Sequence, residues 1–132
     1  MKRKWLMTSL LFLCTALALS ACTVTADKPS AAETIKQSLN TMVNEPVLAS
    51  SSNPNDYIAG HRDVYEAILQ TGSEGLNFLL NQLESSDENG LKEWIMALAS
   101  AELLGEDNPV QDWDSGKDWL RQYNMIATDH SD

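Results

Sequence analysis

The sequence predicts an all-α fold: a single small domain of short antiparallel helices around a central helix at residues 90–104. No stretch alternates apolar and polar residues for long enough to form a β-strand. Several stretches instead repeat apolar residues every three or four positions, which places those residues on one face of a helix. Glycine, proline and capping residues interrupt these stretches at short intervals. The helices are therefore expected to be short and to form a HEAT-like stack or a bundle.

The helix at 90–104 is expected to be central because its apolar side chains cover more than one face. They include Leu91, Trp94, Ile95, Met96, Leu98, Leu103 and Leu104. A helix with one side in water carries an apolar face only ~100° wide. We therefore expect several packing neighbours, with Leu98 in the middle of the apolar stripe. Asn89 is expected to cap the first turn, and Gly105 to end the helix in a left-handed conformation.

Four helices are expected before the central one, at residues 31–44, from residue 54, at 62–70 and from 73 to 83. Ser30 and Glu33 have the spacing of a capping box and open the first helix. Its narrow apolar stripe predicts that it docks loosely or belongs to a tether. Asn53 followed by Pro54 starts the second helix, and Ser73 is expected to cap the fourth.

One helix is expected after the central one. Ser115 and Asp118 again have capping-box spacing, and apolar residues follow at Trp119 and Leu120. The residues after Asn124 are polar, so the end of the chain is expected to fray.

The chain begins with the pattern of a secretory signal. Residues 2–4 are basic, and the apolar stretch from 5 to 19 is shorter than the ~20 residues of a membrane span. The stretch ends in Leu19-Ser20-Ala21-Cys22. With this box the chain resembles bacterial lipoprotein precursors. The resemblance implies lipidation of Cys22, cleavage before it, and anchoring on the extracytoplasmic face of a bacterial membrane. The alternative is an ordinary secretory signal with an incidental cysteine.

Four regions are therefore expected: a signal peptide at 1–21, the lipidated cysteine with a tether and one helix at 22–52, a compact helical domain at 53–124, and a flexible tail at 125–132. Removing 21 of the 132 residues leaves 111, enough for one domain. Six basic residues then stand against nineteen acidic ones, a net charge of −13. This charge argues against nucleic-acid binding, which needs clustered Lys and Arg, and favours a cationic partner.

A series of short motifs spans residues 53–123: Asn53-Pro54, Asp56-Tyr57-Ile58, Gly72, Asn89-Gly90-Leu91-Lys92, Ile95-Met96-Ala97, Glu102-Leu103-Leu104-Gly105, and Trp113 through Gly116 to Trp119 and Tyr123. With these motifs the chain resembles a set of uncharacterised extracytoplasmic domains of Gram-positive bacteria. Such domains occur as small lipoproteins and beside antirepressor metallopeptidases that sense β-lactams. The resemblance implies a helical fold and a surface location, and it carries no known activity.

The residues predict no metal site and no cofactor, and nothing points positively to catalysis. His61 and His130 lack a second His or Cys at ligand spacing, and His61 is expected to be solvated at a helix start. Aligning residues 85–90 with a calcium loop places Met96 where the bidentate glutamate belongs. The chain has no nucleophile-elbow motif and no Gly-rich phosphate loop.

Aromatic and acidic residues are the remaining candidates for a binding surface. Asp107, Asp112 and Asp114 lie in the loop that carries Trp113, the predicted anchor for a cationic protein or peptide. The alternative for Trp113 is a place in the core. The preferred function is a non-enzymatic, lipid-anchored binding module at the cell envelope. A small cell-envelope hydrolase that uses acidic residues, and a purely structural envelope lipoprotein, are the alternatives.

The box at Leu19–Cys22 gives the first testable prediction. Cys22→Ala removes the thiol on which acylation depends, so the variant should keep its leader and lose stable membrane attachment. Mature size by gel electrophoresis and the fraction recovered with membranes measure the two effects. A Cys22→Ala protein of normal mature size that stays with the membrane would rule out lipidation at this residue.

Overall fold

Six α-helices and one 3-10 turn form the part of the chain, residues 27–129, that the computed structural model describes. They are α1 (Ala31–Val43), α2 (Pro54–Gly60), α3 (Arg62–Leu69), α4 (Gly72–Ser85), α5 (Leu91–Leu104), η1 (Gly105–Asp107) and α6 (Gly116–Asp129). Residues 27–129 contain no strand, and the helices pack into one domain. The predicted all-α class is therefore confirmed.

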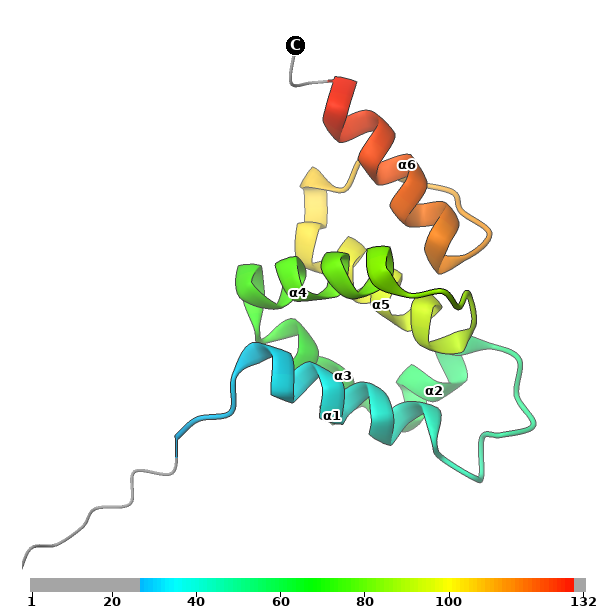
Figure 1. Ribbon diagram of the computed structural model, residues 1–132. Coiled ribbons are helices and arrows are strands. Elements are labelled where there is room, and N and C mark those ends of the chain that lie inside the picture. Colours follow the sequence, from blue (N-terminus) through cyan, green and yellow to red (C-terminus); the bar gives the residue numbers. More distant parts are fainter. Residues whose placement is uncertain (1–26, 130–132) are drawn as a thin grey trace, which may run out of the picture.

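The helices are arranged in layers with α5 in the middle. One layer contains α1 beside α3, the next pairs α4 with α5, and α6 covers the far side of α5 (Figure 1). The paired helices α4 and α5 run in opposite directions (Figure 1). Because α5 contacts each of the other five helices, it is the central helix that its broad apolar surface predicts.

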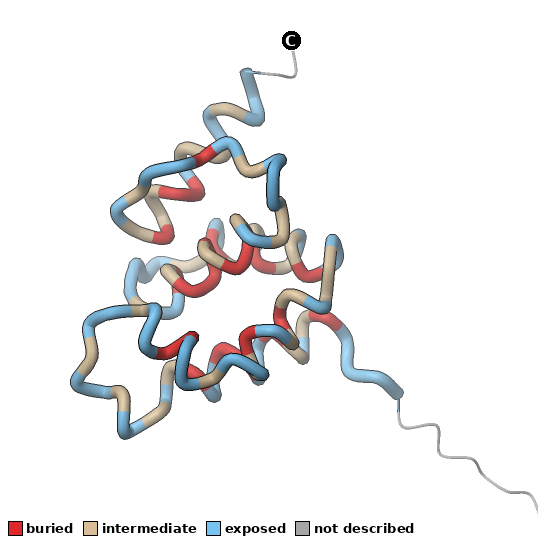
Figure 2. Tube along the Cα trace, turned by 180° about the vertical axis from the view of Figure 1, so that it is seen from behind, coloured by how far each residue is buried: buried red, intermediate tan, exposed pale blue. Residues whose placement is uncertain are grey.

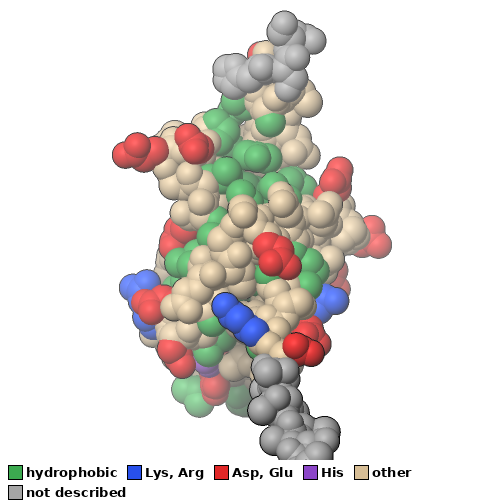
Figure 3. Space-filling view, turned by 90° about the vertical axis from the view of Figure 1, so that its left-hand side faces the viewer, with side chains coloured by type: hydrophobic (Ala, Val, Ile, Leu, Met, Phe, Trp, Pro, Cys, Tyr) green, Lys and Arg blue, Asp and Glu red, His purple; other side chains and the backbone are tan. Residues whose placement is uncertain are grey.

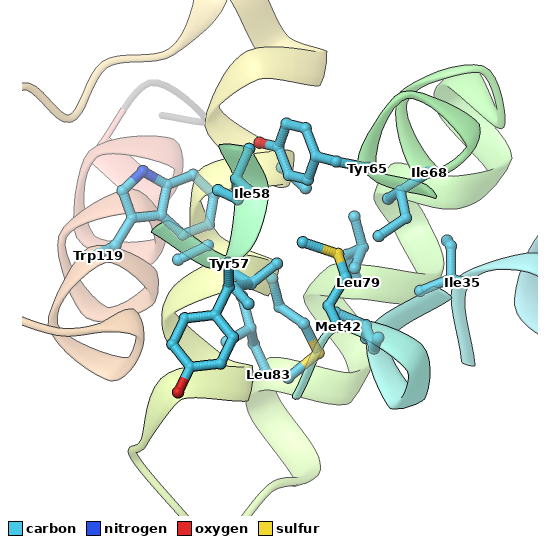
Figure 4. Close-up of a cluster of buried hydrophobic side chains, with 14 of the residues drawn as sticks. Ile35, Met42, Tyr57, Ile58, Tyr65, Ile68, Leu79, Leu83 and Trp119 are labelled. Atoms are coloured by element: carbon cyan, nitrogen blue, oxygen red, sulfur yellow. The ribbon is translucent and has the colours of Figure 1, made fainter. Parts of the chain in front are cut away.

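The core lies between these layers, where the buried positions of neighbouring helices face one another (Figure 2). Its largest fully buried side chains are Trp119, Tyr65, Ile35, Met42, Ile68, Leu79, Leu83, Ile95 and Met96. Figure 4 shows side chains from α1, α2, α3 and α4 gathered in one cluster, with Trp119 of α6 at one side and Ile35 of α1 at the other. All six helices, but not the short turn η1, therefore contribute buried side chains to a single core.

Helix α1 is an integral part of this core. Ile35 and Met42 have no exposed surface, and Leu39 between them is 2% exposed. The expectation of a loosely docked helix, or of a tether segment, is therefore wrong. The apolar stripe of α1 is narrow, but its residues are buried because α1 packs against both α3 and α4.

The buried face of α5 differs in part from the predicted stripe. Ile95, Ala97 and Ala99 have no exposed surface, whereas Leu98, the predicted centre, is only partly buried. The prediction that Leu98 is the centre of a single buried stripe is wrong. The buried residues of α5 face several neighbouring helices and do not form one stripe centred on Leu98. Small side chains on α5 allow these neighbours to approach closely.

Three of the predicted helix caps are confirmed. The side-chain oxygens of Ser30, Asn53 and Ser115 accept hydrogen bonds from backbone N–H groups in the first turns of α1, α2 and α6, at 3.1–3.2 Å. The cap at Ser73 is wrong, because α4 begins at Gly72, which has a φ of 61°. Gly105 has the expected positive φ of 58° at the end of α5, but its ψ of −123° differs from that of the predicted left-handed helical conformation.

Helix α6 is longer than predicted. It continues to Asp129, and Ile126 in this extension packs against the core. The expected fraying after Asn124 is therefore wrong for residues 125–129. The remaining residues, 130–132, lie outside the described part of the chain.

The contact between α5 and α6 gives a prediction about stability. Gly116 at the start of α6 is buried, and a Cβ there would overlap the backbone carbonyl of Glu93. Gly116→Ala should therefore push α6 away from α5 and lower the free energy of unfolding by about 2–3 kcal/mol. Denaturant unfolding followed by circular dichroism measures this loss.

Gly90→Ala is the matched control. A Cβ at Gly90 would find Glu93 Oε2 at 3.8 Å, an ordinary contact, so the loss should stay below about 1 kcal/mol. If both alanine variants lost the same stability, the close approach at Gly116 would not be what holds α6 in place.

Candidate functional site

A groove of about 470 Å³ lies where the segment before α2, the start of α5 and the start of α6 meet. We call it the Trp94 groove. Its lining includes Pro54, Tyr57, Leu91, Trp94 and Asp114. In Figure 1 the three segments that form it lie together on the right of the molecule. Segments that are far apart in the sequence therefore form one concave surface.

The first wall is fixed by the hydroxyl of Tyr57. It donates hydrogen bonds to the carbonyl oxygens of Leu48 at 2.6 Å and Ser51 at 3.2 Å, which hold the preceding loop on α2. The same loop is held by His61, whose Nε2 lies 3.4 Å from the carboxylate of Glu45. The His61 side chain is only 13% exposed, so its expected solvated position is wrong. The wall is thus attached to α2 at several points.

The second wall is joined to the start of α6 by Asn89. Its amide N–H donates to Ser115 Oγ at 3.0 Å, and its Oδ1 accepts from the backbone N–H of Lys117 at 3.1 Å. Asn89 therefore caps α6, and its predicted role as the cap of α5 is wrong. The prediction failed because a capping side chain can serve any helix start that the fold brings close to it.

Glu93, instead of Asn89, provides the side-chain cap at the start of α5. Its two carboxylate oxygens accept hydrogen bonds from the backbone N–H of Gly90 at 2.9 Å and from the hydroxyl of Ser86 at 2.8 Å. The residue is 2% exposed. Burial by itself raises the pKa of the Glu93 carboxyl, but these hydrogen bonds outweigh burial and lower it. Glu93 is therefore a buried, ionised group that fixes the turn between α4 and α5.

Trp94 is the tryptophan that lines the groove, and its ring packs on Trp113. The rings of Trp94 and Trp113 have centroids 4.4 Å apart and planes tilted by 38°. Both residues are partly buried, and Trp94 lines the groove. Trp113 is thus neither a freely exposed anchor nor a fully buried core residue, because it packs on Trp94. The sequence marks Trp94 as an apolar residue of the central helix, but no local pattern places it in the site.

The predicted acidic residues do not form one cluster. Asp112 and Asp114 are exposed on either side of Trp113, and Asp114 lines the groove. Asp107 lies past the other end of α5, and the 14 residues of that helix span ~21 Å. The structure thus brings together Trp113, Asp112 and Asp114, and it separates Asp107 from them.

The charge around the groove is negative. No Lys or Arg lines it. The basic residues nearest to the lining along the chain are Lys92 and Lys117. Lys92 lines a different pocket, and the ammonium group of Lys117 donates to the carbonyl oxygen of Leu83 at 2.5 Å at the end of α4. Acidic side chains also stand at several separate places on the face away from the groove, which Figure 3 shows. A cation approaching the groove therefore meets an acidic domain and no basic side chain in the lining.

Asp118 at the start of α6 is occupied by its own neighbours. The backbone N–H of Asp114 donates to its carboxylate at 3.1 Å, and Gln122 donates to the same oxygen at 3.1 Å. Arg121 forms an ion pair with the other oxygen. These contacts, led by the hydrogen bond from Asp114, lower the pKa of Asp118. Asp118 thus orders the loop beside the groove, which leaves Asp114 as the carboxylate that faces it.

Within residues 27–129, no group of three or more His, Cys, Asp or Glu side chains is arranged to hold a metal ion. Among the same residues, no helix is long and apolar enough to cross a membrane. The predicted lipidation site at Cys22 lies outside the described part of the chain.

Comparison with known proteins adds no relative. No protein-family model, no curated protein and no solved structure matches this chain. The resemblance to extracytoplasmic domains of Gram-positive bacteria therefore stays a prediction from the motifs at residues 53–123.

The lowered pKa of Glu93 gives a prediction about pH. A group whose pKa is lower in the folded chain stabilises fully above its unfolded pKa of about 4.3, and this stabilisation is lost as the pH falls through the folded value. Glu93→Gln should therefore be clearly less stable than the wild type at pH 7. The difference in the free energy of unfolding between the two proteins should shrink towards pH 3. There the protonated Glu93 carboxyl resembles the Gln amide, because each has only one good acceptor oxygen.

Unfolding by urea at a series of pH values measures this difference. Glu84→Gln, which changes an exposed residue, is the control for net charge. A gap between wild type and Glu93→Gln that stays constant from pH 7 to pH 3 would contradict the ionised state assigned to Glu93.

Proposed function

We propose that this protein is a lipid-anchored, non-enzymatic binding module on the extracytoplasmic face of a bacterial membrane, and that it captures a cationic segment of a protein or peptide in the Trp94 groove. The observation that carries the proposal is the composition of the groove. An indole ring and a carboxylate share one concave surface whose lining contains no basic residue.

This composition suits an Arg or Lys side chain. A cation over the face of an indole ring is stabilised by about 0.5–2 kcal/mol, depending on how far it is desolvated. Asp114 is placed to pair with the charged group, while Leu91 and Pro54 offer apolar surface to its aliphatic stem. The negative charge of the whole domain mainly raises the rate of association.

The fixed walls of the groove favour binding further. Tyr57, Asn89 and Glu93 each hold one wall through two hydrogen bonds. A site whose backbone is already ordered loses less conformational entropy when a ligand binds. The groove can therefore contribute affinity although it is small.

The position of the groove agrees with attachment through Cys22. Eight residues separate Cys22 from α1, and a fully extended stretch of that length reaches ~29 Å at most. In Figure 1 the start of α1 lies at the lower left, whereas the groove lies on the right. A domain held through this connection presents the groove away from its point of attachment.

The hydrolase alternative finds less support. A glycosidase-like site needs two carboxyl groups that face one cleft, with the pKa of the acid raised. Asp114 is the only carboxylate in the lining of the groove. The nearby Glu93 is buried and accepts two hydrogen bonds, and the pKa of its carboxyl is lowered, not raised. The structural-lipoprotein alternative differs from the proposal in expecting no binding of a cationic peptide.

The test uses a defined cationic probe, the peptide acetyl-Arg-Ala-Arg-Ala-Arg-amide, and residues 27–129, whose six helices pack around one hydrophobic core. Asp114→Asn should weaken binding up to about fivefold, the effect of one exposed ion pair. Trp94→Leu should weaken it by a similar factor through loss of the cation–ring contact. Isothermal titration calorimetry measures both effects.

Asp107→Asn is the matched control, because it removes the same charge at the far end of α5 and should leave affinity nearly unchanged. Raising salt from ~0.05 to ~0.5 M should slow association, since the Debye length falls from more than ~10 Å to under ~5 Å. Equal weakening by Asp107→Asn and Asp114→Asn would show attraction to the domain as a whole and contradict the groove. No binding by the wild-type domain would favour the structural alternative.

A further inference from the structure

A second, smaller pocket of about 190 Å³ lies between α1 and α4 and extends to the first turn of α5. It is lined by Lys36, Leu39, Asn40, Val43, Phe78, Gln82 and Lys92, and we call it the lysine pocket. It shares no lining residue with the Trp94 groove, so a ligand of the lysine pocket is independent of the proposed function.

The charge of the lysine pocket is opposite to that of the protein. Residues 27–129 contain six basic and eighteen acidic side chains, yet two of the six basic ones line this pocket and no acidic one does. Within the same residues, neither Lys36 nor Lys92 takes part in an ion pair with a carboxylate. Lys92 does act on the neighbouring Glu93, since its charge helps to lower the pKa of that carboxyl, but neither ammonium group is held in an ion pair. Two lysine side chains outside any ion pair therefore border one small concave surface.

The rest of the lining is apolar, with polar groups at its edge. Leu39 is part of the core, Val43 and Phe78 pack against it, and the ammonium of Lys36 lies 5.6 Å from the centre of the Phe78 ring. The Oδ1 of Asn40 already accepts a hydrogen bond from Asn44 at 2.7 Å, which leaves the N–H₂ of Asn40 as a donor. The pocket thus combines an apolar floor with donors and positive charge.

We propose that the lysine pocket binds a small amphipathic anion: a carboxylate joined to an apolar group. The two lysines and Asn40 recognise the carboxylate, and the Leu39–Val43–Phe78 surface covers the apolar group. The volume limits the size of the ligand, because a cavity of about 150 Å³ holds one benzene molecule. A carboxylate with a single ring, or with a short aliphatic chain, fits; a long-chain lipid does not.

The test compares three probes on residues 27–129: phenylacetate, phenylethanol and inorganic phosphate. They carry the charge and the apolar group together, the apolar group alone, and the charge alone. Phenylacetate should shift the amide NMR signals of residues around the pocket in α1 and α4, and each of the other probes should bind more weakly. Phenylethanol or phosphate binding as tightly as phenylacetate would overturn the proposal.

Variants locate the site. Lys36→Gln and Lys92→Gln should each weaken phenylacetate binding up to about fivefold, as expected for a single exposed charge contact. Both residues are exposed, so the thermal unfolding midpoint should not change appreciably. Lys28→Gln removes the same charge outside the pocket and should leave binding nearly unchanged. Equal weakening by Lys28→Gln, or no effect of Lys36→Gln and Lys92→Gln, would overturn the assignment.

Discussion

The packing of the first turn of α6 against the first turn of α5 determines the shape of one whole side of this protein. Gly116 has no side chain, and this allows the backbone of α6 to approach the backbone of Glu93 directly. Asn89 joins the same two turns by hydrogen bonds, and Trp113 packs on Trp94 beside them. Because the start of α6 lies there, Asp114 faces the groove. Without this contact the groove would lose one of its three walls.

The same junction shows how a buried charge can serve a structural purpose. Glu93 is nearly inaccessible to water, and an unpaired carboxylate in that position would be costly. Its hydrogen bonds to Gly90 and Ser86 offset this cost and satisfy an N–H group at the start of α5. At the end of α4, where the last carbonyl oxygens of the helix lack backbone partners, the ammonium of Lys117 donates a hydrogen bond to the carbonyl oxygen of Leu83. The helix ends that meet here are thus satisfied by side chains, Glu93 within α5 itself and Lys117 from α6 at the end of α4.

The Trp94 groove and the lysine pocket, two of the concave surfaces of this acidic domain, differ in their chemistry. The Trp94 groove has an aromatic surface and a carboxylate, whereas the lysine pocket has an apolar floor and two ammonium groups. They lie close to each other on α5, because Lys92 belongs to one and Trp94 to the other. Successive residues of a helix point in different directions, so a single turn can contribute to both surfaces.

The sequence by itself determined the fold class, most helix boundaries and the centrality of α5, because periodicity and caps such as Ser30 and Asn53 are local signals. It also marked Trp113 and Asp114 as a region of interest. Only the tertiary structure decided that Asn89 caps α6, that α1 is buried and that Asp107 lies apart. These outcomes depend on which helix ends and faces meet in space. Local patterns do not contain that information, because the partners are distant along the chain.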